Sequence, residues 1–252
     1  APHAPYTVTD EGFRLIRMYA DQLEIPIHLH LHETASEVSM AIASDNQRPF
    51  ERMLALGIVT PALQTVHMTQ LLPEEIRQLA AHGVHVVHCP ESNLKLASGF
   101  CPVGALIAAG VNVCIGTDGA ASNNNLDMLE EVRTAALLAK GVAGDATVVS
   151  AEQALAMATI NGARMLGLED EIGSLETGKS ADFIAVDMSA LNSQPIHHPL
   201  SQLVYTATGH QVSDVWINGT QVLQNRQLMM VDEARLRRRV DDWFRRISDD
   251  ER

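Results

Sequence analysis

Apolar positions in residues 1–170 follow two alternating patterns: short runs of aliphatic and β-branched residues, and longer stretches with apolar residues on one helical face. The short runs predict strands at 25–32, 62–68, 83–88 and 111–118. The longer stretches predict helices at 9–23, 49–56, 102–109 and 126–140, with further helices beginning near residues 34, 73 and 150. Strands that alternate with helices in this way predict an α/β fold with a parallel sheet and short loops.

The pattern changes after residue 170. Residues 181–187, 212–217 and 220–223 are typical of strands, and Asn218-Gly219 predicts a hairpin turn between the last two. Apolar residues recur at helical spacing near the carboxyl end of the chain and predict a final amphipathic helix. We therefore expect two units, residues 1–168 and a small β module at 169–252.

One predicted strand carries an unusual polar pattern. In residues 25–33, His28, His30 and His32 alternate with two leucines, and on a strand this spacing places all three histidines on one face. Imidazole is unfavourable to bury without partners, so a purely structural strand rarely carries three. A surface strand with a polar face is the alternative interpretation. The flanking isoleucines and leucines argue against it, because they are typical of a buried strand.

Ligand-type residues also lie at the carboxyl ends of the other predicted strands. His30, His67, His88 and Asp118 each fall at or near such an end, and in a parallel (β/α) barrel this rim carries the chemistry. Each has a structural alternative, since an isolated aspartate often caps a helix and an isolated histidine is often a buried hydrogen-bonding group. His88 in particular could line a site or serve only the fold. The presence of all four residues at strand ends favours a functional site.

The net charge and the cysteine content limit the partners and the cellular compartment that we expect for the protein. A net charge of −13 argues against nucleic acid or an anionic membrane as the main partner. The apolar runs are too short to predict a transmembrane helix. The three cysteines, Cys89, Cys101 and Cys114, lack metal-site spacing and are odd in number, so we expect buried free thiols and a cytoplasmic protein.

Several motifs in order give the chain a family resemblance. These are APHAPYTVT at 1–9, HLHLHET at 28–34, VHMTQL at 66–71, HCPESNLKLASG at 88–99 and GTDGAASNNNLDML at 116–129, continued by NGARMLGL, IGSLETGKSADFIAVD and VSDVWINGTQV. The combination resembles the amidohydrolase superfamily and, within it, the S-adenosylhomocysteine/methylthioadenosine deaminase branch. The resemblance implies a (β/α)8 TIM-type barrel, of which strands four or five to eight are present, and a small C-terminal β-sandwich module.

The resemblance also implies roles for individual residues. His30 and Asp118 would bind one divalent metal, Zn2+ or alternatively Fe2+, and Asp118 would also accept a proton from the attacking water. Glu33 would carry a proton to a ring nitrogen of the substrate, and His67 would act beside the activated water. His3, Glu33 and His88 would contact the substrate. The activity implied is that of a hydrolase of C–N bonds other than peptide bonds, which deaminates adenosine, 5'-methylthioadenosine or S-adenosylhomocysteine to the inosine analogue and ammonia.

The chain departs from the family pattern at its start, where the H-x-H motif of barrel strand one has no counterpart. It therefore resembles the C-terminal part of a longer deaminase, and we expect these residues alone to be inactive or nearly so. Two alternatives stay open: a triazine, guanine or cytosine aminohydrolase or chlorohydrolase on the same scaffold, or a non-catalytic scaffold. We also expect a homo-oligomer.

Overall fold

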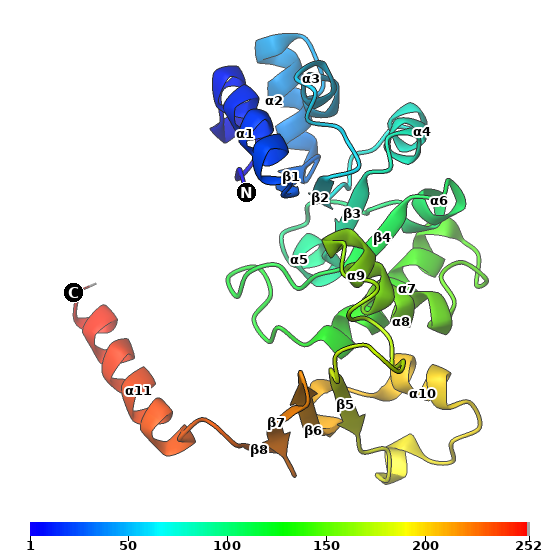
Figure 1. The fold of residues 1–252 in the computed structure, drawn as a ribbon, viewed down its shortest axis with the longest axis vertical. Coiled ribbons are helices and arrows are strands. Elements are labelled where there is room, and N and C mark those ends of the chain that lie inside the picture. Colours follow the sequence, from blue (N-terminus) through cyan, green and yellow to red (C-terminus); the bar gives the residue numbers. More distant parts are fainter. Residues whose placement is uncertain (251–252) are drawn as a thin grey trace.

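The computed structural model describes residues 1–250, and its first part is a parallel sheet (Figure 1). Strands β1 (Ile27–Leu31), β2 (Leu63–His67), β3 (His85–His88) and β4 (Asn112–Ile115) lie side by side in this order, each parallel to the next. The predicted parallel sheet is confirmed. Within residues 1–250 the sheet is open, because β1 and β4 each have only one neighbouring strand.

Helices connect the strands and follow them. They are α1 (Asp10–Leu23), α2 (Ala35–Asp45), α3 (Pro49–Ala55), α4 (Pro73–Ala81), α5 (Pro90–Lys95), α6 (Val103–Ala108), α7 (Met128–Ala143), α8 (Ala151–Met157) and α9 (Ile160–Leu166). Their starts follow local chemistry: the Thr9 hydroxyl accepts a hydrogen bond from the Gly12 N–H, and Ser150 and Gln153 bond each other's backbone. Proline at the first position begins α3, α4 and α5.

Thr34 and Glu37, at the start of α2, form only half of a capping box. The Thr34 hydroxyl accepts a hydrogen bond from the Glu37 N–H at 3.1 Å, as a cap should. The Glu37 carboxylate does not return to Thr34, however. It accepts hydrogen bonds from the N–H groups of His32 at 3.1 Å and Glu33 at 2.7 Å, and so fixes the chain where it leaves β1.

The two faces of the parallel sheet differ in character. Ile27, Leu29 and Leu31 are buried in the main apolar core. The opposite face carries a polar row near the amino ends of the strands, where His28 bonds Gln64 and His85 bonds Asn112. An apolar row lies above it, formed by Val66, Val87 and Cys114 together with Cys89. His30 pairs with Val66 in register and therefore lies at the level of this apolar row, toward the carboxyl edge.

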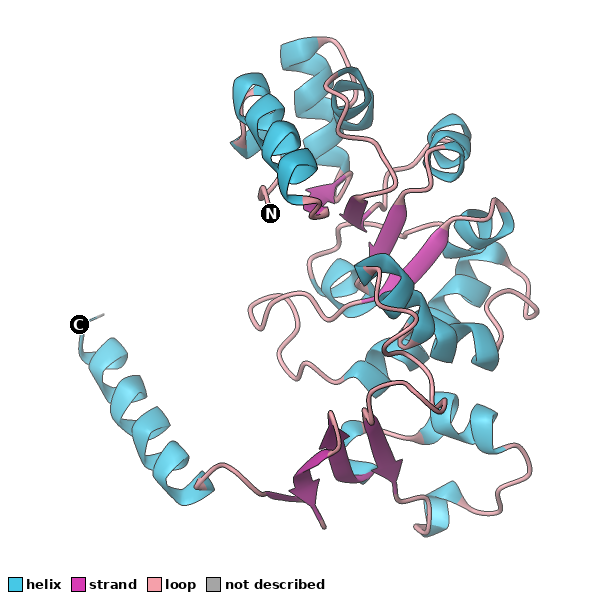
Figure 2. Cartoon of the chain, viewed as in Figure 1, coloured by secondary structure: helices cyan, strands magenta, loops and turns pink. Residues whose placement is uncertain are grey.

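The second part of the chain contains an antiparallel sheet, separated from the parallel strands by helices and loops (Figure 2). Its strands are β5 (Phe183–Val186), β6 (Val212–Ile217), β7 (Thr220–Gln224) and β8 (Gln227–Leu228), in that order, and the predicted Asn218-Gly219 turn joins β6 to β7. Residues 1–250 contain no further sheet facing this one, so the sandwich expected from the resemblance is not confirmed within these residues.

Two helices accompany this sheet in different ways. Helix α10 (Pro199–Thr206) packs against α7 and α8, and its fully buried Val204 belongs to the core of the parallel sheet. Helix α11 (Glu233–Asp250) stands apart from both sheets (Figure 1). The predicted boundary at residues 168 and 169 remains a prediction, and α10 shows that the second segment contributes to the first core.

Two further expectations concern the cysteines and membrane-spanning helices. All three cysteines are free and buried, and burial raises the pKa of the Cys114 thiol to about 12. Among residues 1–250, no helix is long and apolar enough to cross a membrane.

Candidate metal centre and active site

Three predicted site residues converge at the carboxyl edge of the parallel sheet. His30 comes from β1, His67 ends β2 and Asp118 follows β4, and one ligand atom from each lies within 4.8 Å of the other two. The rings of His30 and His67 are stacked, with centroids 5.3 Å apart and planes inclined by 21°. Imidazole nitrogens and a carboxylate oxygen at this separation fit the donor set that zinc prefers.

His30 is oriented by the N-terminal segment. Its Nδ1 lies 2.7 Å from the carbonyl oxygen of His3, so Nδ1–H donates to that carbonyl. The other ring nitrogen, Nε2, is then left with a free electron pair, which is the arrangement that metal-binding histidines use. The His3 ring lies beside it, with centroids 5.2 Å apart, and is exposed. His3 therefore lies at the site, where its backbone carbonyl oxygen orients the ring of His30.

His67 reaches the site because the backbone turns at the end of β2. Its φ is +75° and that of Met68 is +51°, which ends the regular alternation of the strand. Nδ1 of His67 lies 2.9 Å from the Asn93 side-chain oxygen, and Nε2 lies 3.8 Å from a Glu33 carboxylate oxygen. Burial lowers the pKa of His67 below its ordinary value, so the ring is neutral at neutral pH.

Asp118 is held as a carboxylate. One oxygen, Oδ2, accepts hydrogen bonds from the hydroxyl groups of Ser92 and Ser122, each at 2.6 Å. Burial acts to raise the pKa of Asp118, but these two hydroxyl bonds and the Gly119 N–H outweigh it, and the pKa lies below its ordinary value. An ionised carboxylate with one oxygen engaged presents the other oxygen to a ligand.

Glu33 is clamped through its backbone. Its N–H donates to Glu37 at 2.7 Å, and its carbonyl oxygen accepts a hydrogen bond from the Thr69 hydroxyl at 2.6 Å. The Ser98 hydroxyl lies 3.4 Å from one carboxylate oxygen, while the other faces His67. These contacts fix a partly exposed acid beside the convergent histidines, which suits a group that exchanges protons with a substrate.

The other two histidines of residues 25–33 lie away from the convergent group. His28 lies at the amino end of β1 and bonds Gln64 at 3.1 Å. His32 lies beyond the strand with a φ of +53°, and its Nε2 accepts the Phe50 N–H at 3.1 Å, so the expectation that it shares the His30 face is wrong. Burial lowers the pKa of His32 to about 4, which keeps this structural ring neutral.

His88 is fully buried beside His67. Burial, and to a lesser extent His67, lowers the pKa of His88 to about 3. Its Nδ1 is buried without a hydrogen-bond partner among the described residues. A role for His88 in contacting the substrate remains a prediction.

Several residues that orient the site were not found by sequence reasoning. They are Ser92, Asn93, Ser98, Ser122 and Thr69, which bond the side chains or backbone of the predicted residues. Small polar residues in loops after strands carry no distinctive spacing. The only available signal was that all five fall inside stretches that carry the family resemblance, namely 66–71 for Thr69, 88–99 for Ser92, Asn93 and Ser98, and 116–129 for Ser122.

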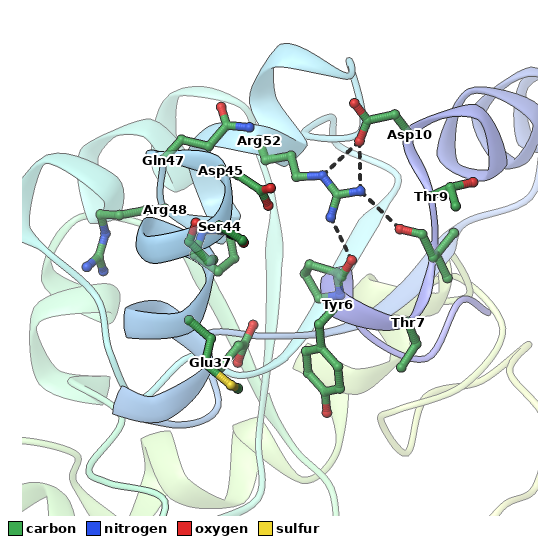
Figure 3. Close-up of a pocket in the computed structure, with 15 residues that line it drawn as sticks. Tyr6, Thr7, Thr9, Asp10, Glu37, Ser44, Asp45, Gln47, Arg48 and Arg52 are labelled. Atoms are coloured by element: carbon green, nitrogen blue, oxygen red, sulfur yellow. Dashed lines mark hydrogen bonds and ion pairs between the residues drawn. The ribbon is translucent and has the colours of Figure 1, made fainter.

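A cavity of about 720 Å3 lies between the N-terminal segment, α2 and α3 (Figure 3). Arg52 spans it, bonding Asp10 and the carbonyl oxygens of Pro5 and Val8. Tyr6 lines this cavity, and burial followed by the charges of Glu33 and Glu37 raises its pKa. The cavity therefore borders the candidate site through Tyr6, although the convergent histidines do not line it.

Comparisons with known proteins give a family match and several similar relatives. A family model described as the amidohydrolase family matches residues 1–222. A 5-methylthioadenosine/S-adenosylhomocysteine deaminase of Teredinibacter turnerae is 52% identical over 98% of this chain and 56% of its own length. One of Moorella thermoacetica is 50% identical over 92% of this chain and 54% of its own length. The chain thus spans just over half the length of these curated relatives.

Solved structures give the same picture. An adenosine deaminase from Xanthomonas campestris with bound zinc is 57% identical, with a TM-score of 0.96 over 98% of this chain and 56% of that one. The atrazine chlorohydrolase of Arthrobacter aurescens complexed with zinc is 27% identical, with a TM-score of 0.85 over 93% of this chain and 52% of that one. Both solved structures contain zinc, and the convergent histidines and aspartate of this chain could hold a metal ion.

Proposed function

Because the chain belongs to the amidohydrolase family, we propose that it acts in the zinc-dependent hydrolytic deamination of an adenosine-type nucleoside, with release of ammonia. The observation that carries the proposal is the convergence of His30, His67 and Asp118 within 4.8 Å, with Glu33 beside His67. Adenosine, 5'-methylthioadenosine and S-adenosylhomocysteine are the proposed substrates, which the names of the relatives support.

The residues present fit a divalent metal. His30 and Asp118 each offer an unengaged ligand atom, and Nε2 of the neutral His67 lies in the same group. We propose Zn2+ as the resident ion, with Fe2+ as the alternative. A zinc ion held there would lower the pKa of a water molecule and so supply a nucleophile at neutral pH.

Glu33 and Asp118 transfer protons in the proposed reaction, and His67 holds the attacking water. Glu33 donates a proton to the ring nitrogen next to the amino-bearing carbon, which makes that carbon open to attack. Asp118 accepts the proton released by the attacking water, and His67 holds that water through its unprotonated Nε2. Asp118 then passes this proton to the amino group, the C–N bond breaks and ammonia leaves, and the proton of the added hydroxyl group returns to Glu33 as the carbonyl forms. His3 and His88 flank this site and are the proposed contacts to the base.

The architecture supports a wider proposal. We infer that β1 to β4 are the last four strands of a (β/α)8 barrel and that β5 to β8 form one layer of a β-sandwich, with a domain boundary after residue 168. The match over nearly the whole chain to the zinc-containing deaminase supports this. The three buried free thiols support a cytoplasmic location. A homo-oligomer is a further proposal, which light scattering on the purified chain would test.

An ammonia-release assay tests the proposed activity. The chain would be assayed with zinc in two forms, alone and fused behind the N-terminal part of the Teredinibacter turnerae relative. Adenosine, methylthioadenosine, S-adenosylhomocysteine, guanine and melamine would be supplied in parallel. We expect the fusion to deaminate the adenosine-type compounds and the chain alone to show little or no release. In the fusion, Glu33→Gln should reduce the rate by about 100-fold or more.

The outcomes separate the alternatives. Release from guanine or melamine but not from the nucleosides would assign the site to the other class of aminohydrolase. A fusion that binds zinc but releases ammonia from none of the compounds would favour a non-catalytic scaffold. Ammonia release by the chain alone, in a zinc-dependent manner, would contradict only the expectation that these residues need more of the barrel.

A further inference from the structure

Ser92 and Asn93, two adjacent residues of α5, contact side chains of the candidate site. The Ser92 hydroxyl donates to Oδ2 of Asp118 at 2.6 Å, and the side-chain oxygen of Asn93 lies 2.9 Å from Nδ1 of His67. Both side chains are almost fully buried, at 0% and 1% exposure, so bulk water does not compete for these bonds. We propose that the Ser92–Asn93 pair positions the site by setting the tautomer of His67 and by selecting which oxygen of Asp118 faces the metal.

The His67 half of the inference follows from proton placement. An amide oxygen can only accept a hydrogen bond, so the bond to Asn93 requires the proton of the neutral ring on Nδ1. Nε2 is then unprotonated and faces the site, where Glu33 lies 3.8 Å away. The opposite amide orientation would place an NH2 group against Nδ1 and require the proton on Nε2. That tautomer would have no electron pair to offer a metal or its water.

The Asp118 half follows from the geometry of its carboxylate. Oδ2 accepts two hydroxyl bonds, from Ser92 and Ser122, and these occupy its two lone-pair directions. The other oxygen, Oδ1, is the one left for a metal, so Asp118 would bind through a single oxygen. Both halves depend on one short segment, because Ser92 and Asn93 are consecutive.

A buried carboxylate on α7 holds that segment in place. Glu131 accepts the backbone N–H of Glu91 at 3.2 Å with one oxygen and the side-chain amide of Asn123 with the other. Glu91 directly precedes the pair, and Asn123 lies in the loop that carries Asp118 and Ser122. Helix α7 therefore ties the segment that positions the ligands to the loop that supplies one of them. This connection fixes the position of Ser92 and Asn93 relative to the loop that carries Asp118.

The tautomer of His67 can be measured without metal or substrate. Two-bond 1H–15N correlation spectra of the metal-free chain near neutral pH distinguish the protonated from the unprotonated ring nitrogen, and His67→Gln assigns the signal. We expect His67 to carry its proton on Nδ1. A wild-type spectrum with the proton on Nε2 would overturn the inference whatever the variants do.

Variants then show whether Asn93 is responsible. Asn93→Leu should move His67 mainly to the Nε2–H form, whereas Asn93→Asp retains an acceptor oxygen and should keep the proton on Nδ1. Asn112→Leu is a matched control, because Asn112 contacts the Nδ1 of His85 at 2.9 Å at the opposite end of the sheet. It should change the His85 signal and leave that of His67 unchanged. A folded Asn93→Leu variant with an unaltered His67 signal would refute the role of Asn93.

Zinc affinity tests the Asp118 half, and this part rests on the proposed metal centre. Competition against a chelator should show Ser92→Ala weakening zinc binding by about 10- to 100-fold, the range typical of lost partners behind a ligand. Ser98→Ala is the control, since its hydroxyl faces Glu33 and no proposed ligand. Equal affinity of wild type and Ser92→Ala would refute this half. Failure of the wild type to bind zinc would instead refute the metal centre, and the tautomer measurement would decide the inference by itself.

Discussion

The buried carboxylate of Glu131 should make the stability of the chain fall between about pH 5 and about pH 8. Glu131 is 0% exposed, and burial, which acts against the hydrogen bonds it receives, raises its pKa from 4.5 to about 7. In the unfolded chain the group loses its proton near its ordinary pKa. Between these two values the folded state holds the proton and the unfolded state does not, so the free energy of unfolding decreases as the pH rises.

The size of the effect follows from the shift. A difference from 4.5 to about 7 corresponds to about 3 kcal/mol at 1.36 kcal/mol per pKa unit, fully lost once the pH exceeds the folded pKa. Glu131→Gln removes the titration but keeps the shape. Both partners of Glu131 are donors, so the new amide nitrogen faces one of them, which costs about 1–3 kcal/mol at every pH.

The prediction therefore concerns how the difference in the free energy of unfolding between wild type and Glu131→Gln changes with pH. At about pH 5 the Gln variant should be less stable than wild type, and toward about pH 8 the gap should close or reverse. Urea unfolding followed by far-UV circular dichroism, with a chelator present to keep metal off the site, measures both curves. Val132→Ala on the same helix is the control, because Val132 is buried and cannot titrate, so its effect should not vary with pH. A gap for Glu131→Gln that stays constant across this range would refute the raised pKa.

Three further outcomes are expected. Arg48→Met should lower the free energy of unfolding by about 3 kcal/mol, because Glu75, with which Arg48 pairs at 2.6 Å, would stay buried without its cation; urea unfolding measures this. Gly99→Ala should lower both the thermal stability and the activity of the fusion. The φ of Gly99 is +134°, and the added carbon would come 2.9 Å from the Thr69 hydroxyl, which bonds the Glu33 carbonyl oxygen. An unchanged melting temperature and an unchanged rate would contradict this prediction. Removing zinc from the loaded chain should lower its melting temperature, since zinc present at 100 times its dissociation constant stabilises by about 2.7 kcal/mol; a scan with and without chelator tests this, and His30→Ala should abolish the difference.

The structure also shows why burial alone would mislead in a search for the site. His32, His67 and His88 are all at most 1% exposed, yet His32 serves the Phe50 backbone whereas His67 belongs to the convergent group. His30 is only half-buried and joins the convergent group. Burial therefore does not separate the convergent histidines from a structural one.

Much of this arrangement was determined by the sequence alone. Periodicity sufficed for the alternating strands and helices and for the antiparallel module, because burial of one face imposes a period on each element. The positions of His30, His67 and Asp118 at strand ends predicted a shared edge, because parallel strands place their carboxyl ends together. The helix starts near residues 9 and 150 were likewise predicted, because a cap acts over three residues.

Tertiary structure decided what depends on contacts between distant residues. Left-handed backbone at His67 and Asp118 turns these side chains onto the site, and left-handed backbone at His32 takes that side chain away, none of which follows from strand alternation. The partners that orient the three convergent side chains come from 26 or 27 residues away along the chain: His3 for His30, Asn93 for His67, Ser92 for Asp118. A hydrogen bond across such a separation exists only once the sheet has formed, because packing and not local sequence brings its two atoms together.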